Sequence, residues 1–117
     1  MPSKLSGKTV YQMHARICKV LSNPKRLEII HLLRDGERAV GDLVDKMGAA
    51  KANVSQQLAV MAEKGILESR REGQYIYYRL AYPKMLKAYD LLREILFEQL
   101  QKGMDLAQRL KKASRGK

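Results

Sequence analysis

Apolar residues change their spacing once along this chain, immediately after Gly65. Over residues 51–64 they recur at intervals of four and three, which is typical of a helix with one buried face. Residues 67–71 and 74–80 instead alternate with a period of two around Glu72-Gly73, a signal for a β-hairpin. The apolar positions of the helix are Val54, Leu58 and Met61. A helix followed directly by a short hairpin limits the fold of this chain more than any other feature.

Two longer helices are predicted nearer the start of the chain. Residues 9–21 carry apolar side chains at helical spacing, and so does the segment 24–33. Between them, Asn23 can cap the second helix, and Pro24 fits its first position. We therefore expect one helix to end and another to begin within a few residues.

A shorter helix is expected just before the helix over 51–64. Residues 37–40 read as short and extended, and residues 41–47 read as a two-turn helix that Gly48 closes. The order short helix, tight turn, second helix and hairpin is that of a winged helix-turn-helix. We predict a mainly α fold with a small β-hairpin wing.

The last predicted helix is long. From Met85 the chain stays helical almost to Lys112, with an apolar stripe along one side. About 28 residues rise about 42 Å, more than a small domain can cover, so a second copy of the chain is the natural cover. Gly103 interrupts good helix formers at a cost of roughly 1 kcal/mol relative to Ala, and it marks either a break or a close helix crossing.

The length of 117 residues suits one domain. We expect that domain to cover residues 9–112, between a flexible basic tail over 1–8 and a second one over 113–117. No apolar run approaches the length of a membrane span, and the first residues lack a hydrophobic signal region. The single cysteine fits a reducing cytoplasm.

The charge balance points to an anionic partner. The chain has 23 Lys and Arg against 12 Asp and Glu, a formal net charge of +11, and a nucleic acid is the leading candidate. An ordinary basic protein and a basic helix on a membrane surface are the alternatives that composition leaves open. An enzyme is disfavoured, because the sequence has no phosphate-binding glycine loop, no nucleophile-base set and no complete metal site.

The helix over 51–64 carries uncharged polar residues opposite its apolar face, where a solvated helix would more often carry Lys and Glu. Gln and Asn can hold adenine through two hydrogen bonds in the major groove, and Ala52 and Ala59 allow close approach. On the wing, Arg70 and Arg71 are expected at phosphates or in a minor groove. The predicted DNA contacts are Lys51, Asn53, Ser55, Gln56, Gln57, Arg70, Arg71, Gln74 and Tyr75.

Three stretches together resemble the ArsR/SmtB family of bacterial and archaeal repressors, namely LSNPKRLEIIHLL, VGDLVDKMGAAKANVSQQLAVMAEKGIL and ESRREGQYIYYRL. The match covers roughly residues 12–95. The resemblance implies a homodimer built from helices 9–21 and 83–112. It also implies repression at a palindromic operator and release by an effector. The residues expected at the dimer interface are Val10, Met13, Ile17, Tyr89, Leu92, Leu96 and Leu100.

The chain departs from the family at its familiar metal sites. The stretch 37–43 has no Cys-x-Cys pair, and residues 83–112 contain no His, so no metal or cofactor is predicted and the effector is unknown. Ala50 stands where the family often has Ser before the recognition helix, and Gln57 stands where His is common. The two departures at the recognition helix bear on which DNA bases the protein prefers rather than on how it binds DNA.

His14 and Cys18 lie four residues apart, so one helix face presents both. Their side chains can ligate zinc or copper, and a dimer could supply two such pairs, but two ligands are half a site. A lone Cys in a helix that packs at an interface is more often a small buried residue, and metal binding and thiol redox chemistry are the alternatives. His31 reads as a core residue rather than a ligand. The role of the apolar stripe along the last helix is open as well. The stripe could line a pocket for an organic effector, but it is more often the core of a dimer.

Two further functional hypotheses stay open at this point. A small basic dimer could coat DNA without sequence preference, as a chromatin-like protein does. A winged helix can also lose DNA binding and become a protein-interaction module, which the polar helix face and the arginine wing argue against.

Overall fold

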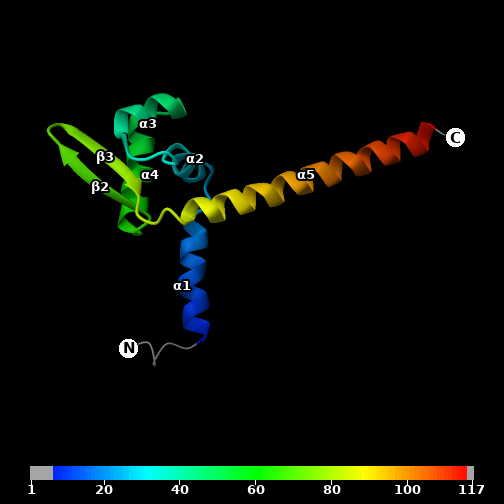
Figure 1. Cartoon of the computed structure of the whole chain (residues 1–117), viewed down its shortest axis with the longest axis horizontal. Helices are drawn as coiled ribbons and strands as arrows, with labels where there is room; N and C mark the ends of the chain where they lie inside the picture. The colour runs from blue at the N-terminus through cyan, green and yellow to red at the C-terminus, as the bar shows by residue number, and fades with distance from the viewer. Residues whose placement is uncertain (1–6, 116–117) are drawn as a thin grey trace. The chain divides into compact units, whose positions relative to one another are not determined.

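The computed structural model describes residues 7–115 and consists mainly of helices, with one small antiparallel sheet (Figure 1). The elements are α1 (Gly7–Val20), α2 (Pro24–Leu32), β1 (Arg38–Ala39), α3 (Val40–Met47), α4 (Lys51–Glu63), β2 (Leu67–Glu72), β3 (Tyr75–Leu80) and α5 (Met85–Arg115). The predicted order of helices and hairpin is confirmed, and α3, α4 and the β2–β3 wing form a winged helix-turn-helix. Among the described residues, no helix is long and apolar enough to cross a membrane.

The described chain divides into two compact units, one ending at Met85 and one beginning at Leu86. The boundary between the two units falls at the start of α5, and the single domain expected over residues 9–112 stays a prediction. A long helix satisfies its backbone hydrogen bonds internally, so it can form a unit of its own.

The core of the first unit is formed by the buried faces of α2, α3 and α4. Val54, Leu58 and Met61 have no exposed surface, as their spacing predicts. Ile29 and Ile30 of α2 are equally buried, and Leu43 of α3 completes this set. Each such side chain contributes about 1.5–3 kcal/mol through the hydrophobic effect, so this cluster holds α4 in place.

The predicted start of α2 and the predicted end of α3 are confirmed, whereas α2 ends one residue earlier and α3 begins one residue earlier than predicted. The Asn23 side-chain Oδ1 accepts hydrogen bonds from the backbone N–H groups of Lys25 (2.9 Å) and Arg26 (3.3 Å), which satisfies two donors that the helix cannot. Gly48 closes α3 in the left-handed conformation, with φ of +59°.

The wing differs from the prediction in two ways. Its turn is Gly73-Gln74 rather than Glu72-Gly73, because Glu72 pairs with Tyr75 in the ladder. Gly73 takes the first central position with φ of +63°, which glycine adopts at little cost. In addition, β1 pairs with β3, so the sheet has three strands in the order β1-β3-β2.

The terminal helices are longer than expected. Gly7 and Lys8 belong to α1, and α5 continues past Lys112 as far as Arg115, so these residues are not tails. Nothing in either stretch breaks a helix, and both ends extend through local backbone hydrogen bonds. The remaining tail positions, 1–6 and 116–117, lie outside the described residues. Gly103 leaves α5 continuous.

Candidate nucleic-acid interface

Helix α4 presents its polar residues on the side away from its buried face. Lys51, Asn53 and Gln56 are exposed, whereas Ser55 and Gln57 are half-buried. Ala52 and Ala59 are exposed between them. Lys51, Asn53 and Gln56 are therefore accessible beside small alanines, whereas Ser55 and Gln57 are only partly accessible.

Gln57 differs from Gln56 because it already has a partner within the protein. Arg26 of α2 donates a hydrogen bond from Nε to Oε1 of Gln57 at 2.8 Å. A guanidinium can only donate, so the oxygen of the Gln57 amide must face Arg26, which takes one of its two acceptor positions and leaves the NH₂ group free for another molecule. Gln56 makes no side-chain hydrogen bond with the residues that the structure describes, and both functions of its amide are available.

The first turn of α4 has no side-chain cap. Ala50 occupies the cap position with extended backbone angles (φ −64°, ψ 136°), and its backbone carbonyl accepts from the Val54 N–H, but its side chain has no oxygen to offer the N–H groups of the first turn. These N–H groups, the positive end of the helix dipole and Lys51 together favour an anionic group at this end of the helix.

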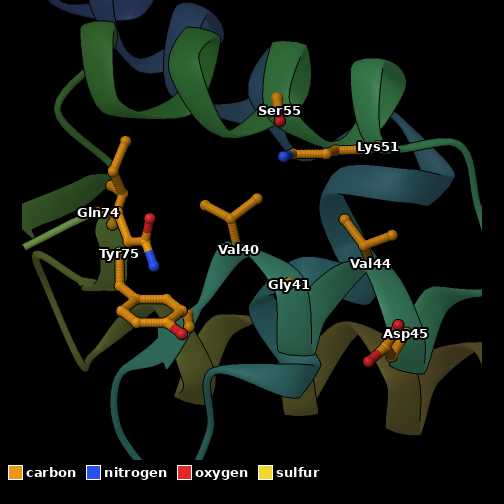
Figure 2. A pocket seen from close by; sticks show the side chains of 10 residues that line it. Val40, Gly41, Val44, Asp45, Lys51, Ser55, Gln74 and Tyr75 are labelled. Carbon is orange, nitrogen blue, oxygen red and sulfur yellow. The ribbon is translucent and has the colours of Figure 1, made fainter.

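A hollow of about 440 Å³ lies between α3, the start of α4 and the tip of the wing (Figure 2). Lys51 and Ser55 line it from α4, whereas Gln74 and Tyr75 line it from the wing. The structure thus brings together predicted contacts from two separate stretches of sequence. Its other lining residues include Val40, Val44 and the carboxylate of Asp45 from α3.

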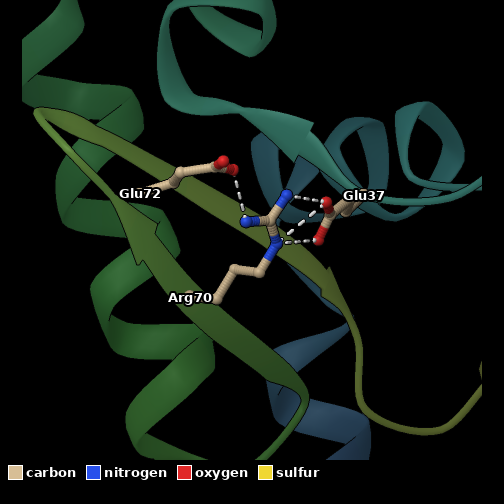
Figure 3. Close-up of polar contacts among 3 residues, drawn as sticks. All are labelled: Glu37, Arg70 and Glu72. Atoms are coloured by element: carbon tan, nitrogen blue, oxygen red, sulfur yellow. Dashed lines mark hydrogen bonds and ion pairs between the residues drawn. The ribbon is translucent and has the colours of Figure 1, made fainter.

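The two arginines of the wing lie on opposite faces of the hairpin, because neighbouring residues of a strand alternate. Arg70 donates to Glu37 and to Glu72, with shortest distances of 2.5 Å and 2.7 Å (Figure 3). These hydrogen bonds from Arg70 hold the pKa of Glu37 below its usual value, against a smaller effect of burial. Arg71 is exposed, and its guanidinium has no hydrogen bond or ion pair with the described residues.

Both Arg26 and Glu37 were missed as functional candidates. Arg26 is separated from Gln57 by 31 positions, and Glu37 from Arg70 by 33. Pairs that are this far apart leave no local pattern in a sequence. Only the strand register and the packing of α2 on α4 bring them together.

The sensing candidates are accessible on α1. His14 and Cys18 are both exposed. Within the described residues, no three His, Cys, Asp or Glu side chains are grouped as they would be around a metal ion. The prediction that His31 belongs to the core is wrong: it is exposed, because α2 turns Ile29 and Ile30 inward instead.

The residues expected at a dimer interface are largely uncovered in the single chain. Of the predicted set, Val10, Met13, Ile17, Leu92, Leu96 and Leu100 are between 44% and 56% exposed. Tyr89 is buried, and the Arg93 guanidinium stacks 4.8 Å from its ring centroid and donates to its hydroxyl. Further along α5, Phe97, Met104 and Leu110 add to the exposed apolar surface.

The fold, the exposed polar helix and the adjoining wing define a winged helix-turn-helix DNA-binding protein. The sequence pattern described as "Bacterial regulatory protein, arsR family" matches residues 23–69. The chain is 39% identical over 85 residues to the biofilm growth-associated repressor of Xylella fastidiosa. The aligned residues cover 73% of this chain and 75% of that protein.

Solved structures agree with this result. A homodimeric winged helix-turn-helix domain from Mycobacterium bovis, described as a possible ArsR-family regulator, has a TM-score of 0.72 at 32% identity and covers 85% of this chain and 94% of that one. Rv0081 of Mycobacterium tuberculosis, an HTH-type transcriptional regulator, has a TM-score of 0.71 at 32% identity, with 80% and 94% covered. The chain belongs to the arsR family and is a DNA-binding transcriptional regulator.

Proposed function

We propose that this regulator represses transcription by binding, as a homodimer, to a palindromic operator from which an effector releases it. The observation that carries the proposal is the hollow in which Lys51 and Ser55 of α4 adjoin Gln74 and Tyr75 of the wing. A major groove admits one helix, and a hairpin beside that helix can follow the neighbouring backbone.

Within this arrangement the α4 residues have separate roles. Asn53 and Gln56 are exposed with free amides and suit base edges. Gln57 keeps its NH₂ group free while Arg26 holds its oxygen in place, so it suits an acceptor such as guanine O6 or thymine O4. Lys51 and the uncapped start of α4 suit a phosphate.

A homodimer is supported by the exposed apolar side chains of α1 and α5 and by the homodimeric relative from M. bovis. Two copies carry a formal charge of +22, which favours association with DNA. Sedimentation at micromolar concentration should show a dimer, and a monomer would contradict this part of the proposal. Because DNA is the partner, we place the protein in the cytoplasm.

The test of operator recognition is competition between DNA sequences. The promoter adjoining the gene should be preferred over random DNA by ~10³-fold or more. Equal affinity for the two would instead support a chromatin-like protein that coats DNA.

The effector is addressed by a release assay on the bound operator. Zinc, cadmium or arsenite at low micromolar concentration should leave the DNA bound, because the familiar ligand sets of the family are missing from 37–43 and 83–112. Any inorganic or redox signal should act through Cys18, the only thiol, with His14 one turn away. Release by peroxide or persulfide that persists in Cys18→Ser would exclude the thiol and favour an organic effector.

A further inference from the structure

Arg70 reaches across the sheet of the wing. Its strand, β2, is an edge strand, and β3 lies between β2 and β1. Arg70 pairs in the ladder with Tyr77 of β3, and its guanidinium lies 4.5 Å from the centroid of the Tyr77 ring. From there it reaches Glu37, the residue immediately before β1 (Figure 3). One side chain therefore connects both edges of the three-stranded sheet.

The geometry around the Arg70 guanidinium is restrictive. Arg70 Nε lies 3.0 Å from each carboxylate oxygen of Glu37, and a second guanidinium nitrogen lies 2.5 Å from Oε1. The remaining nitrogen donates to Glu72 at 2.7 Å, which leaves the planar fork engaged on both sides. Exposed ion pairs contribute little to global stability, so the consequence of this arrangement is orientation: it fixes β2 against the segment that leads into α3.

Arg71 lies on the other face of the hairpin from Arg70. It pairs in the ladder with Ile76, which lines the hollow together with Lys51 and Ser55 of α4. Arg71 therefore lies on the hairpin face that packs against the helices, the face of Ile76 and of the buried pair Leu67 and Leu80. Tyr75 lies on the face of Arg70 and reaches the hollow only at the tip of the hairpin. Its charge is exposed and unpaired among the described residues.

We propose that Arg70 is a positioning residue, which together with Glu37 fixes the angle of the wing relative to α3 and α4, and that Arg71 alone supplies the arginine charge of the wing to the DNA backbone. The proposal rests on the proposed function, since it takes the α4–wing surface as the one that binds DNA. The proposal gives different roles to two adjacent arginines that look equivalent in the sequence.

The first test is the salt dependence of affinity for a random-sequence duplex. Arg71→Gln should weaken binding and lower the log–log slope by about one unit for each phosphate that the protein no longer neutralises. Arg70→Gln should weaken binding while the slope stays that of the wild type, because the arginine that it removes does not touch a phosphate. A slope lowered by Arg70→Gln as much as by Arg71→Gln would overturn the division of roles.

The second test uses the sign of the Glu37 effect. Removing an acidic side chain from a DNA-binding unit strengthens binding if only its charge matters. If Glu37 positions the wing through Arg70, Glu37→Gln should weaken binding, and exchanging the two charges in Glu37→Arg/Arg70→Glu should recover part of the loss. Binding by Glu37→Gln that equals or exceeds that of the wild type would contradict a positioning role.

A third measurement needs no DNA and separates failure of this inference from failure of the proposed function. Hydrogen exchange at the β1 and β3 amides of the free protein should be faster in Arg70→Gln and Glu37→Gln than in the wild type. Arg71→Gln is the matched control and should exchange as the wild type does. Unchanged exchange in Arg70→Gln would refute the positioning role, whereas a wild type that binds no duplex DNA would refute the function but not the role of Arg70 in the sheet.

Discussion

Helix α4 and the outer face of the wing, the hairpin face that carries Glu68, Arg70, Glu72 and Arg79, differ in whether their polar side chains are paired within the protein. On α4, Asn53 and Gln56 are exposed and keep their hydrogen-bonding groups for a partner. On the outer face of the wing, Arg79 pairs with Glu68 at 3.1 Å and Arg70 pairs with Glu72 at 2.7 Å. The helix presents free polar groups, and that strand face satisfies its own.

The difference shows that charge near a binding surface is not the same as charge available to a ligand. Whether an arginine of the wing is paired within the protein or available to DNA depends on the face of the hairpin on which it lies. Alternation along β2 places Arg70 and Arg71 on different faces. Net charge of +11 draws the protein toward DNA, but the unpaired groups determine which contacts it makes there.

The largest expected effect separates the two faces of α4. Leu58 has no exposed surface, so Leu58→Ala should lower the free energy of unfolding by about 2–5 kcal/mol through reduced burial and the cavity left behind. Gln56→Ala, two positions earlier on the exposed face, should stay within about 0.5 kcal/mol of the wild type. Urea unfolding measures both. Comparable destabilisation of the two variants would mean that α4 has no free face.

The next effect distinguishes the two glutamines. Gln56→Ala should reduce the preference for operator over random DNA by about 1–3 kcal/mol, the discrimination that a pair of hydrogen bonds to one base provides. Gln57→Ala should reduce it less, because Arg26 already occupies the Gln57 oxygen at 2.8 Å. Binding to both DNAs by fluorescence anisotropy provides the measurement. Equal weakening on operator and random DNA would assign these residues to the phosphates.

The spacing of residues within one helix, and the residues just before its start, predict the local features of this fold. The buried set of Val54, Leu58 and Met61 follows from helical spacing alone, and the Asn23 cap follows from its position before Pro24. The wing turn is an exception, because Glu72-Gly73 fits a two-residue loop as well as Gly73-Gln74 does, and only the pairing of Glu72 with Tyr75 decides between them.

Features that depend on tertiary structure could not be predicted in this way. The bond from Arg26 to Gln57 and the reach of Arg70 to Glu37 each join residues more than 30 positions apart. The pairing of β1 with β3 is equally non-local. Two adjacent arginines in a sequence therefore look alike until the sheet separates them.

A smaller effect concerns the uncapped start of α4. Ala50→Ser should raise the free energy of unfolding by about 1 kcal/mol, because a hydroxyl at the cap position can accept from an N–H group of the first turn. Ala52→Ser is the control, since a serine inside the helix cannot cap it and should be slightly destabilising. Thermal unfolding of the three proteins tests this. An Ala50→Ser variant no more stable than Ala52→Ser would mean that the first turn is already satisfied.

The smallest effect is expected on the outer face of the wing, at the base of the hairpin. Glu68 and Arg79 are a directly opposed pair in the ladder, with side chains 52% and 54% exposed. Such a pair contributes about 0.2–1 kcal/mol, so Arg79→Gln should change stability very little.

If the outer face lies away from DNA, Arg79→Gln should also leave the salt slope of DNA binding unchanged, although it removes the same charge as Arg71→Gln. Net charge is then matched between the two variants, and any difference in slope reports position alone. A slope lowered by Arg79→Gln would place DNA on the outer face and remove the contrast between free and self-paired arginines.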